Sequence, residues 1–450
     1  MNPIIAFEQS AVERLRKAAE IDPLETCAAG LVATAGTRAG RPRLLVRELA
    51  PVSPDAYVYR SAYGAELSPA FCMSLANRAR ASGCGAALAH THPGSDSLGD
   101  FSQTDNRGEA PLRAYFDRRA PGSQHVSALV TVSGGACRSL GARGNATFQV
   151  VGRYLREIAG VDLAAGSTIA ERYDRQVRIF GPDAQRELHG RRVAVVGCGG
   201  TGSFVATELA YLGVGDFLLI DNDVVDESNL NRLIGATPAD VGTSKAVVAA
   251  NWISKIAPQT KTSARVADVV DHDVAIALLD CDFIFLCTDS HASRAIVNQI
   301  AYQYLIPTID VGVAIHSRGG TITDVVGRVQ MLSSGLPCLV CSGWIDSNQV
   351  RTEMMNAEQR RTDPYFSGPG VPQPAVVSLN GTVSSLAITM FLSATAGVPS
   401  APRLLLYDAL RGAVRPTAMD PVANCLVCSS TGSLARGDTW DLPTRRDAVR

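Results

Sequence analysis

Residues able to bind a metal ion gather in the first third of the chain. His90 and His92 stand at the end of a small-residue apolar stretch, Gly85–Ala89, which predicts a strand, and Asp105 follows after a loop. Side chains at positions i and i+2 of a strand point to one face. Two imidazoles and a carboxylate can therefore ligate one zinc ion and leave a fourth position for water, as in catalytic zinc sites.

An acid able to activate such a water comes earlier in the chain. Glu25 precedes an apolar stretch, Cys27–Thr34, which we also predict to be a strand. A carboxylate within hydrogen-bond reach of a metal-bound water can act as its general base. Two assignments stay open at this point. The alternatives are Asp96 and Asp100 for the third ligand, and Glu20 and Glu48 for the base.

A second group of residues suits nucleotide binding. The largely apolar run Arg192–Val196 predicts a buried strand, and it leads into a turn with glycine at positions 197, 199, 200 and 202. Glycines let the backbone approach phosphates, and the following helix N-terminus offers free N–H groups. The next expected strand, Asp216–Ile220, is followed by Asp221, where a ribose-binding acid belongs. This motif alone does not identify the nucleotide.

Four of the 11 cysteines form two Cys-x-x-Cys pairs, Cys338 with Cys341 and Cys425 with Cys428. Two such pairs can hold a tetrahedral zinc ion. Two redox pairs, or four buried thiols, are the alternatives. The other seven cysteines are scattered, mostly among apolar neighbours, where they favour small buried hydrophobic roles.

Composition limits the class of protein. Apolar residues make up 46% of the 450 residues, and 42 Lys and Arg against 43 Asp and Glu leave a net charge of −1. We therefore expect no nucleic-acid partner. The longest apolar runs are shorter than the roughly 20 residues of a membrane span, and no signal peptide is visible. We expect a cytoplasmic enzyme that does not bind membranes.

The elements that position these residues change character near residue 150. Residues 1–150 mix strands and helices without strict alternation, which predicts an α+β domain. Residues 151–171 are interpreted as a linker. Strand and helix then alternate over 172–435, which predicts an α/β domain with a mostly parallel, Rossmann-like sheet. Residues 436–450 form a polar tail.

The second domain carries six motifs in a fixed order. They are Arg172–Gln176, Gly213–Gly215, Asp221–Asp223, Ser228–Arg232, Gly242–Lys245 and Cys287–Asp289. Together with the glycine turn they resemble the ThiF/MoeB/ubiquitin-activating (E1-like) family of adenylating enzymes over about residues 168–430. The resemblance implies that ATP adenylates the C-terminal glycine of a ubiquitin-like protein and that pyrophosphate leaves.

The resemblance also implies residue roles. Asp221 would hold the ribose of ATP, and Asp289 would bind Mg²⁺. Asn229, Arg232 and Lys245 would bind the phosphates, which suits a reaction that depends on charge neutralisation. The resemblance further assigns Arg175 to a neighbouring subunit's site, which implies a homodimer. It makes the four paired cysteines a structural zinc site remote from ATP.

One departure from that family concerns the acceptor of the activated carboxyl group. Many relatives have a cysteine after the first Cys-x-x-Cys pair, but residues Ser342–Asn424 contain none. The segment Thr362–Pro374 offers only hydroxyl groups. A thiol of another protein, a hydroxyl, or a cysteine elsewhere in the chain remain alternatives.

The first domain resembles the JAMM (JAB/MPN) metalloproteases over about residues 5–145. The resemblance rests on His90-Thr-His92-Pro and Ser102-x-x-Asp105, with Glu25 upstream. It implies that His90, His92 and Asp105 ligate zinc, that Glu25 is the general base, and that Ser102 hydrogen-bonds the oxyanion. The loop between His92 and Ser102 is longer than is usual in that family.

Together the two resemblances predict a bifunctional enzyme of a bacterial ubiquitin-like pathway, with ATP, Mg²⁺, one catalytic and one structural zinc. Its partners would be a ubiquitin-like protein and a conjugating enzyme. The protease could trim a precursor or reverse conjugation. Two other functions stay open: activation of a sulfur carrier for cofactor or cysteine synthesis, and an assembly module whose protease half is inactive.

Overall fold

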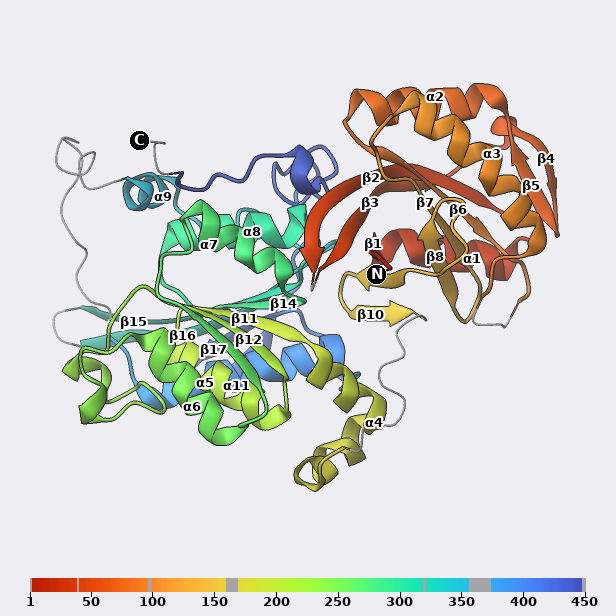
Figure 1. Ribbon diagram of the computed structural model, residues 1–450. Coiled ribbons are helices and arrows are strands. Elements are labelled where there is room, and N and C mark those ends of the chain that lie inside the picture. Colours follow the sequence, from red (N-terminus) through yellow and green to blue (C-terminus); the bar gives the residue numbers. More distant parts are fainter. Residues whose placement is uncertain are drawn as a thin grey trace. The chain divides into compact units, whose positions relative to one another are not determined.

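The computed structural model describes residues 2–38, 40–95, 99–158, 169–318, 321–355 and 374–446 (Figure 1). The chain forms two compact units. The first comprises Met1–Asp162 with Tyr302–Leu305 and Ala423–Asp441. The second comprises Leu163–Ala301, Ile306–Val422 and Leu442–Arg450.

The first unit is built on an eight-stranded sheet of order β10-β9-β1-β3-β2-β6-β7-β8, beside a two-stranded sheet of β4 and β5. Its strands are β1 Ile4–Glu8, β2 Cys27–Arg38, β3 Arg41–Pro51, β4 Tyr57–Ser61, β5 Gly64–Leu67, β6 Gly85–Thr91, β7 Val126–Val130, β8 Gly135–Ser139, β9 Thr147–Val151 and β10 Leu155–Ile158. Its helices are α1 Gln9–Ile21, α2 Pro69–Ala81 and α3 Gln103–Arg119.

Alternation along the strands divides the core of this unit between the two faces of the sheet. On β2, Ala28 and Val32 belong to one apolar cluster together with Leu15 of α1. Leu31 belongs to the other, which includes Phe116 of α3 and residues of α2. Because successive side chains of a strand point to opposite faces, α1 covers one face while α2 and α3 cover the other.

The second unit has an eight-stranded sheet of order β13-β12-β11-β14-β15-β16-β17-β18. Five neighbouring strands are parallel, namely β13, β12, β11, β14 and β15. Strands β16, β17 and β18 are antiparallel to their neighbours. The strands are β11 Arg192–Val196, β12 Asp216–Ile220, β13 Lys261–Arg265, β14 Phe283–Leu286, β15 Thr308–Arg318, β16 Thr321–Leu332, β17 Leu404–Asp408 and β18 Ala413–Pro416.

Helices cover both faces of the second sheet. Figure 1 shows α5, α6 and α11 on one side of it and α7 and α8 on the other. The helices are α4 Asp174–Gly190, α5 Gly200–Leu212, α6 Lys245–Ile256, α7 His272–Ala277, α8 His291–Gln303, α9 Ser347–Met354 and α11 Val377–Thr395. This is a Rossmann-like α/β arrangement, with the carboxyl ends of β11, β12 and β14 at one edge.

Helix α11 has the length and composition of a membrane span, with 19 residues and a mean hydropathy of 1.3. Only its length and its composition suggest that it could cross a membrane. Half of that apolar window is buried, and α11 packs against α5, β15 and β16. Burial of this kind is that of a core helix, and the sequence pattern did not predict it.

The predicted elements agree with the structure where the apolar pattern is strong. The sequence predicts strands over Arg192–Val196, Asp216–Ile220 and Phe283–Leu286 and a helix over Lys245–Ile256, and β11, β12, β14 and α6 have these bounds. A further helix is predicted from Phe204 to Leu212, whereas α5 begins at Gly200. Strand β15 runs on to Arg318 and pairs with β16 as a long antiparallel hairpin, which we had not predicted. Strand β10 lies within the stretch that we interpreted as a linker.

Candidate functional site

Four polar side chains converge in the first unit. His90 belongs to β6, His92 follows that strand, and Asp105 lies in the first turn of α3. One ligand atom of His90, one of His92 and one of Asp105 all lie within 4.8 Å of one another. The Nε2 atom of His90 is 3.1 Å from Asp105 Oδ1, and the Nε2 atom of His92 is 3.6 Å from Asp105 Oδ2. Glu25 Oε1 is 3.8 Å from His92 Nε2.

Local structure explains how Glu25 reaches the histidines. Cys27, at the start of β2, pairs with His90 in the antiparallel ladder of β2 and β6. Residues just before β2 therefore lie beside the end of β6. The main chain of Glu25 is held by Ser61 O, which accepts its N–H at 2.8 Å, and by Arg60, which donates to its carbonyl at 2.7 Å.

Ser102 positions Asp105 by capping α3. Its hydroxyl oxygen accepts the Asp105 N–H at 3.1 Å, and Asp105 Oδ2 accepts the Ser102 N–H at 2.6 Å. This reciprocal capping box fixes the first turn of the helix. Oδ1 of the same carboxylate faces His90. The structure thus gives Ser102 a structural task besides the oxyanion role that remains a prediction.

The charges of the cluster are coupled. Burial raises the pKa of Asp105, but the adjacent imidazoles of His90 and His92 outweigh it and hold that pKa well below its usual range. Burial raises the pKa of Glu25, and the two imidazoles partly offset the rise. The hydrogen bond to Asp105 raises the pKa of His92. The ionised carboxylate of Asp105 suits a metal ligand. The buried carboxyl group of Glu25, whose pKa is raised, suits a general base.

The residues fit a zinc ion. With zinc–ligand bonds of 2.0–2.1 Å, two tetrahedral N or O ligands lie about 3.3 Å apart. The distances of 3.1 and 3.6 Å from Asp105 to the two histidines bracket that value. His90 Nε2 is buried and lacks a well-aligned hydrogen bond. It is therefore a donor atom that a metal would satisfy.

The alternatives for these roles do not reach the cluster. Asp100 and Glu20 are exposed, and the Glu48 carboxylate pairs with Arg47 and Arg78. Asp96 lies outside the described residues. Among the residues that the structure describes, Asp105 and Glu25 are the acids at the two histidines.

In the second unit, the glycine turn joins β11 to α5. Gly197 has a φ of 88°, and a Cβ atom there would lie 2.8 Å from Cys287 O. A Cβ on Gly202 would lie 1.8 Å from Gly197 O. These glycines are required by the turn itself. Gly199 differs, because a Cβ there meets nothing within 4 Å and its φ is −79°. Gly199 therefore leaves open space at the amino end of α5.

Asp221 stabilises this turn through two hydrogen bonds. Its carboxylate accepts the backbone N–H of Cys198 at 2.6 Å and that of Asp223 at 2.8 Å. Burial raises the pKa of Asp221, and these two hydrogen bonds partly offset the rise. Nearby, Lys245 at the start of α6 pairs with Asp223 at 2.7 Å. The structure thus adds Asp223 to the site as the carboxylate that orients Lys245.

Two further side chains flank the turn. A Cβ on Gly200 would lie 3.6 Å from Arg232 Cδ and 2.2 Å from Asn380 Nδ2. Arg232 was predicted to bind phosphate, and the structure brings it to the glycine turn. Asn380 comes from α11, far along the chain, and no sequence motif marked it. Its position beside Gly200 adds an amide donor to this edge of the sheet.

The remaining predicted residues lie in the same unit. Asn229 accepts the Asp226 N–H at 3.2 Å through its side-chain oxygen. Asp289 is exposed and follows β14, and its carbonyl accepts from Arg294. Arg175 is exposed on α4. A single exposed carboxylate suits Mg²⁺, which usually keeps several waters and binds substrate phosphates.

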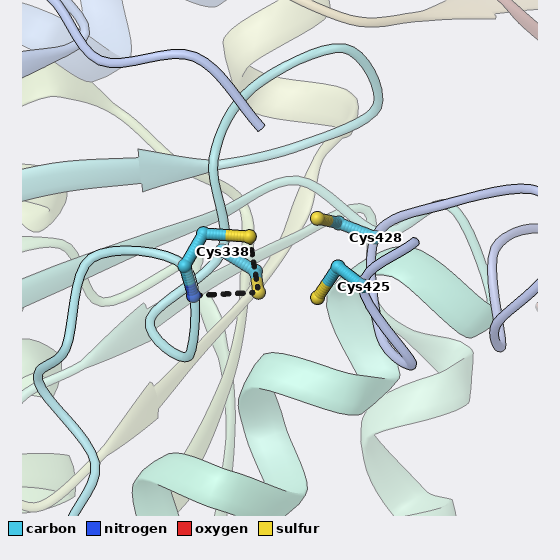
Figure 2. Close-up of side chains that lie close together, drawn as sticks. Cys338, Cys425 and Cys428 are labelled. Carbon is cyan, nitrogen blue, oxygen red and sulfur yellow. Dashed lines mark hydrogen bonds between the residues drawn. The ribbon is translucent and has the colours of Figure 1, made fainter. Parts of the chain in front are cut away.

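The four paired cysteines come together. The sulfur atoms of Cys338, Cys341, Cys425 and Cys428 all lie within 4.8 Å of one another. Figure 2 shows three of them labelled, with their sulfur atoms facing a common space. The Cys338 and Cys341 sulfurs are 3.7 Å apart. That matches the roughly 3.8 Å expected for two thiolates on one zinc ion with bonds of about 2.3 Å.

The segment in which we sought an acceptor, Thr362–Pro374, lies outside the described residues except for Pro374. Elsewhere, Cys198 and Cys287 lie at the glycine turn, but burial raises the pKa of both thiols well above its usual range. Neutral buried thiols are poor nucleophiles. The acceptor of the activated carboxyl group therefore stays open.

Comparison with known proteins gives three findings. The sequence model of the ThiF family matches residues 173–427. The SAMP-activating enzyme E1 of Haloferax volcanii is 28% identical over 274 residues, which are 60% of this chain and 93% of that protein. The molybdopterin-synthase adenylyltransferase of Escherichia coli is 29% identical over 259 residues, 57% of this chain and 95% of that protein.

A solved structure resembles more than half of the chain. The crystal structure of MccB from E. coli with ATP covers 58% of this chain and 75% of its own. The TM-score is 0.46 and the sequence identity is 19%.

Proposed function

The chain belongs to the ThiF family, and we propose that its second unit uses ATP to adenylate the C-terminal glycine of a ubiquitin-like or sulfur-carrier protein. The observation that carries this proposal is the convergence of Arg232 and Asn380 on the glycine turn, with Lys245 at the next helix start. The relatives support it, since one is named for activating SAMP and another for adenylating molybdopterin synthase.

The chain's own residues have distinct tasks in this proposal. The substrate carboxylate attacks the ATP α-phosphorus, the bond to the β-phosphate oxygen breaks, and an acyl adenylate and pyrophosphate form. The open amino end of α5 receives phosphate, while Arg232 and Lys245 neutralise its charge. Asp221 holds the turn and offers its remaining lone pairs to ribose. Asp289 would hold Mg²⁺, which supplies further charge neutralisation at the phosphates.

Pyrophosphate exchange tests this proposal. Lys245→Ala should reduce exchange at least about a hundredfold, because a charge aimed at phosphate is lost. Lys255→Ala is the matched control, since Lys255 is exposed near the end of the same helix α6. It should leave exchange unchanged. Full exchange by the Lys245→Ala protein would refute the assignment of the site.

For the first unit we propose a zinc peptidase that cleaves after the C-terminal glycine of the same partner. The supporting observation is the cluster of His90, His92, Asp105 and Glu25 described above. These side chains would hold the ion and a water, and Glu25 would take the proton from that water. Zinc-dependent cleavage of a ubiquitin-like fusion protein is the test. An assembly module without protease activity would bind the fusion intact.

Zinc content separates the proposals further. An active peptidase together with the cysteine site requires two zinc ions per chain, whereas an inactive first unit that has lost its metal would leave one. Conjugation and sulfur transfer share the adenylation step. They are distinguished by whether the activated partner passes to a conjugating enzyme or to a sulfurtransferase. Each outcome can be followed by mass spectrometry of the partner's C-terminus.

A further inference from the structure

A charged cluster in the second unit has no role in the proposal so far. Asp310 of β15 is fully buried, and two arginines share its carboxylate. Arg294 of α8 donates to it at 3.3 Å through Nε, and Arg328 of β16 donates at 2.9 Å through Nε and also through Nη2. Two guanidinium groups against one carboxylate leave an excess of one positive charge.

The cluster lies at the edge of the sheet where ligands bind in this class of fold. Asp310 is in register with Leu286 of β14, and Leu286 is in register with Val196, the residue before Gly197. The cluster is therefore level with the glycine turn, at the carboxyl ends of parallel strands. Arg294 also donates to the carbonyl of Asp289 at 3.3 Å. This contact ties the cluster to the loop proposed to bind Mg²⁺.

Gly312, which has no side chain, lies beside the guanidinium groups of Arg294 and Arg328. Gly312 pairs with Arg328 in the β15–β16 hairpin and is half-buried. A Cβ atom on Gly312 would lie 3.6 Å from Arg294 Nη2 and 3.7 Å from Arg328 Nη2. The Arg328 guanidinium stacks on Trp344 at 4.4 Å, and the buried indole N–H lacks a hydrogen-bond partner among the described residues. Donors therefore exceed acceptors here.

We propose that Arg294 and Arg328 form the subsite that binds the free C-terminal carboxylate of the protein substrate. The proposal rests on the adenylation function given above. Guanidinium groups bind carboxylates through paired N–H donors, and Asp310 and Trp344 hold them in place. The carboxylate must approach the anionic phosphates of ATP, so an excess positive charge beside the nucleotide offsets their repulsion. A side chain at position 312 would lie against the Nη2 atoms of both arginines, and Gly312 has none.

Peptide binding tests the subsite directly. The probe is a fluorescent peptide that ends in Gly-Gly with a free carboxylate, compared with the same peptide as its C-terminal amide. Anisotropy is measured on the full chain with a non-hydrolysable ATP analogue present. The parent should bind the acid about tenfold more tightly than the amide, as expected for a charge-assisted hydrogen-bonded pair. Arg294→Ala should abolish this preference, and Arg294→Lys should retain part of it.

Two further variants keep the test independent of folding. Arg415→Ala removes an exposed cation from β18 and should leave the preference intact. Gly312→Asp places a carboxylate among the guanidinium groups, so it should abolish the preference while melting at the parent temperature. Equal binding of acid and amide by the parent, or an unchanged preference in Arg294→Ala, would overturn the inference. A preference without pyrophosphate exchange would keep the subsite and refute the adenylation proposal instead.

Discussion

Glu25 is the residue that separates metal binding from catalysis in the first unit. It is buried, and its carboxylate lies near His92 but outside the set of three ligands. Glu25→Gln keeps the shape of the side chain, replaces one acceptor oxygen by an amide donor, and removes the base. We predict that this protein binds zinc like the parent and cleaves a ubiquitin-like fusion at least about a hundredfold more slowly.

His92→Ala is the matched comparison, since His92 is a proposed ligand. That variant should lose both the zinc and the cleavage. Zinc is measured by competition with a chelating dye, and cleavage by the size of the products. A Glu25→Gln protein that cleaves at the parent rate would show that another group is the base.

Residues of the two sites differ in how far sequence could predict them. His90 and His92 stand two residues apart at a strand end and Asp105 follows after a loop, so their convergence could be predicted from the sequence, whereas the capping of α3 by Ser102 was not predicted. Asn380 and Asp310 were missed. Asn380 reaches Gly200 from a helix nearly two hundred residues later, and Asp310 acquires its arginines only through the packing of α8 and β16 on β15. No local pattern encodes such contacts.

At the scale of elements, the β11–α5 turn contains glycines of two kinds. Gly202→Ala would drive a Cβ atom to 1.8 Å from a backbone oxygen, so the turn must distort. Gly199→Ala meets nothing within 4 Å. We predict that Gly202→Ala lowers the free energy of unfolding by about 3 kcal/mol. Gly199→Ala should melt like the parent and yet bind ATP less tightly, because its methyl group enters the space open to phosphate.

Chemical denaturation and nucleotide binding measured on both proteins check this contrast. A Gly199→Ala protein with parental ATP affinity would mean that phosphate does not lie at the amino end of α5. A stable Gly202→Ala protein would contradict the close approach of α5 to the turn.

Elements with strong apolar patterns were predicted well. Strands β11, β12 and β14 are buried on both faces and read as continuous apolar runs, which fixed their bounds. The antiparallel β15–β16 hairpin was missed because β16 begins with four exposed residues, where the apolar signal is weak. Helix α11 was missed because it has many small and hydroxyl side chains, whose burial depends on packing against α5.

At the scale of the whole molecule, the sequence indicated two units of different architecture, and the structure has two separate eight-stranded sheets. The cluster of His90, His92 and Asp105 lies within the first unit and the glycine turn within the second. Since each site is built within its own unit, we predict that Glu25→Gln leaves pyrophosphate exchange unchanged and that Lys245→Ala leaves zinc-dependent cleavage unchanged. Measuring both activities on both proteins checks this. Loss of both activities in either variant would show that the sites are coupled.

Assembly is the property of the whole molecule that remains a proposal. Arg175 is exposed on α4, and the resemblance places its counterpart in a neighbouring subunit's site. If Arg175 acts across a homodimer, Arg175→Ala and Lys245→Ala proteins should each be inactive alone. After mixing they should regain about a quarter of parental exchange, because half of randomly mixed dimers combine the two chains and each has one intact site. Native mass spectrometry verifies the mixing. If mixed dimers form and exchange does not return, Arg175 acts within its own chain or has no role at the phosphates.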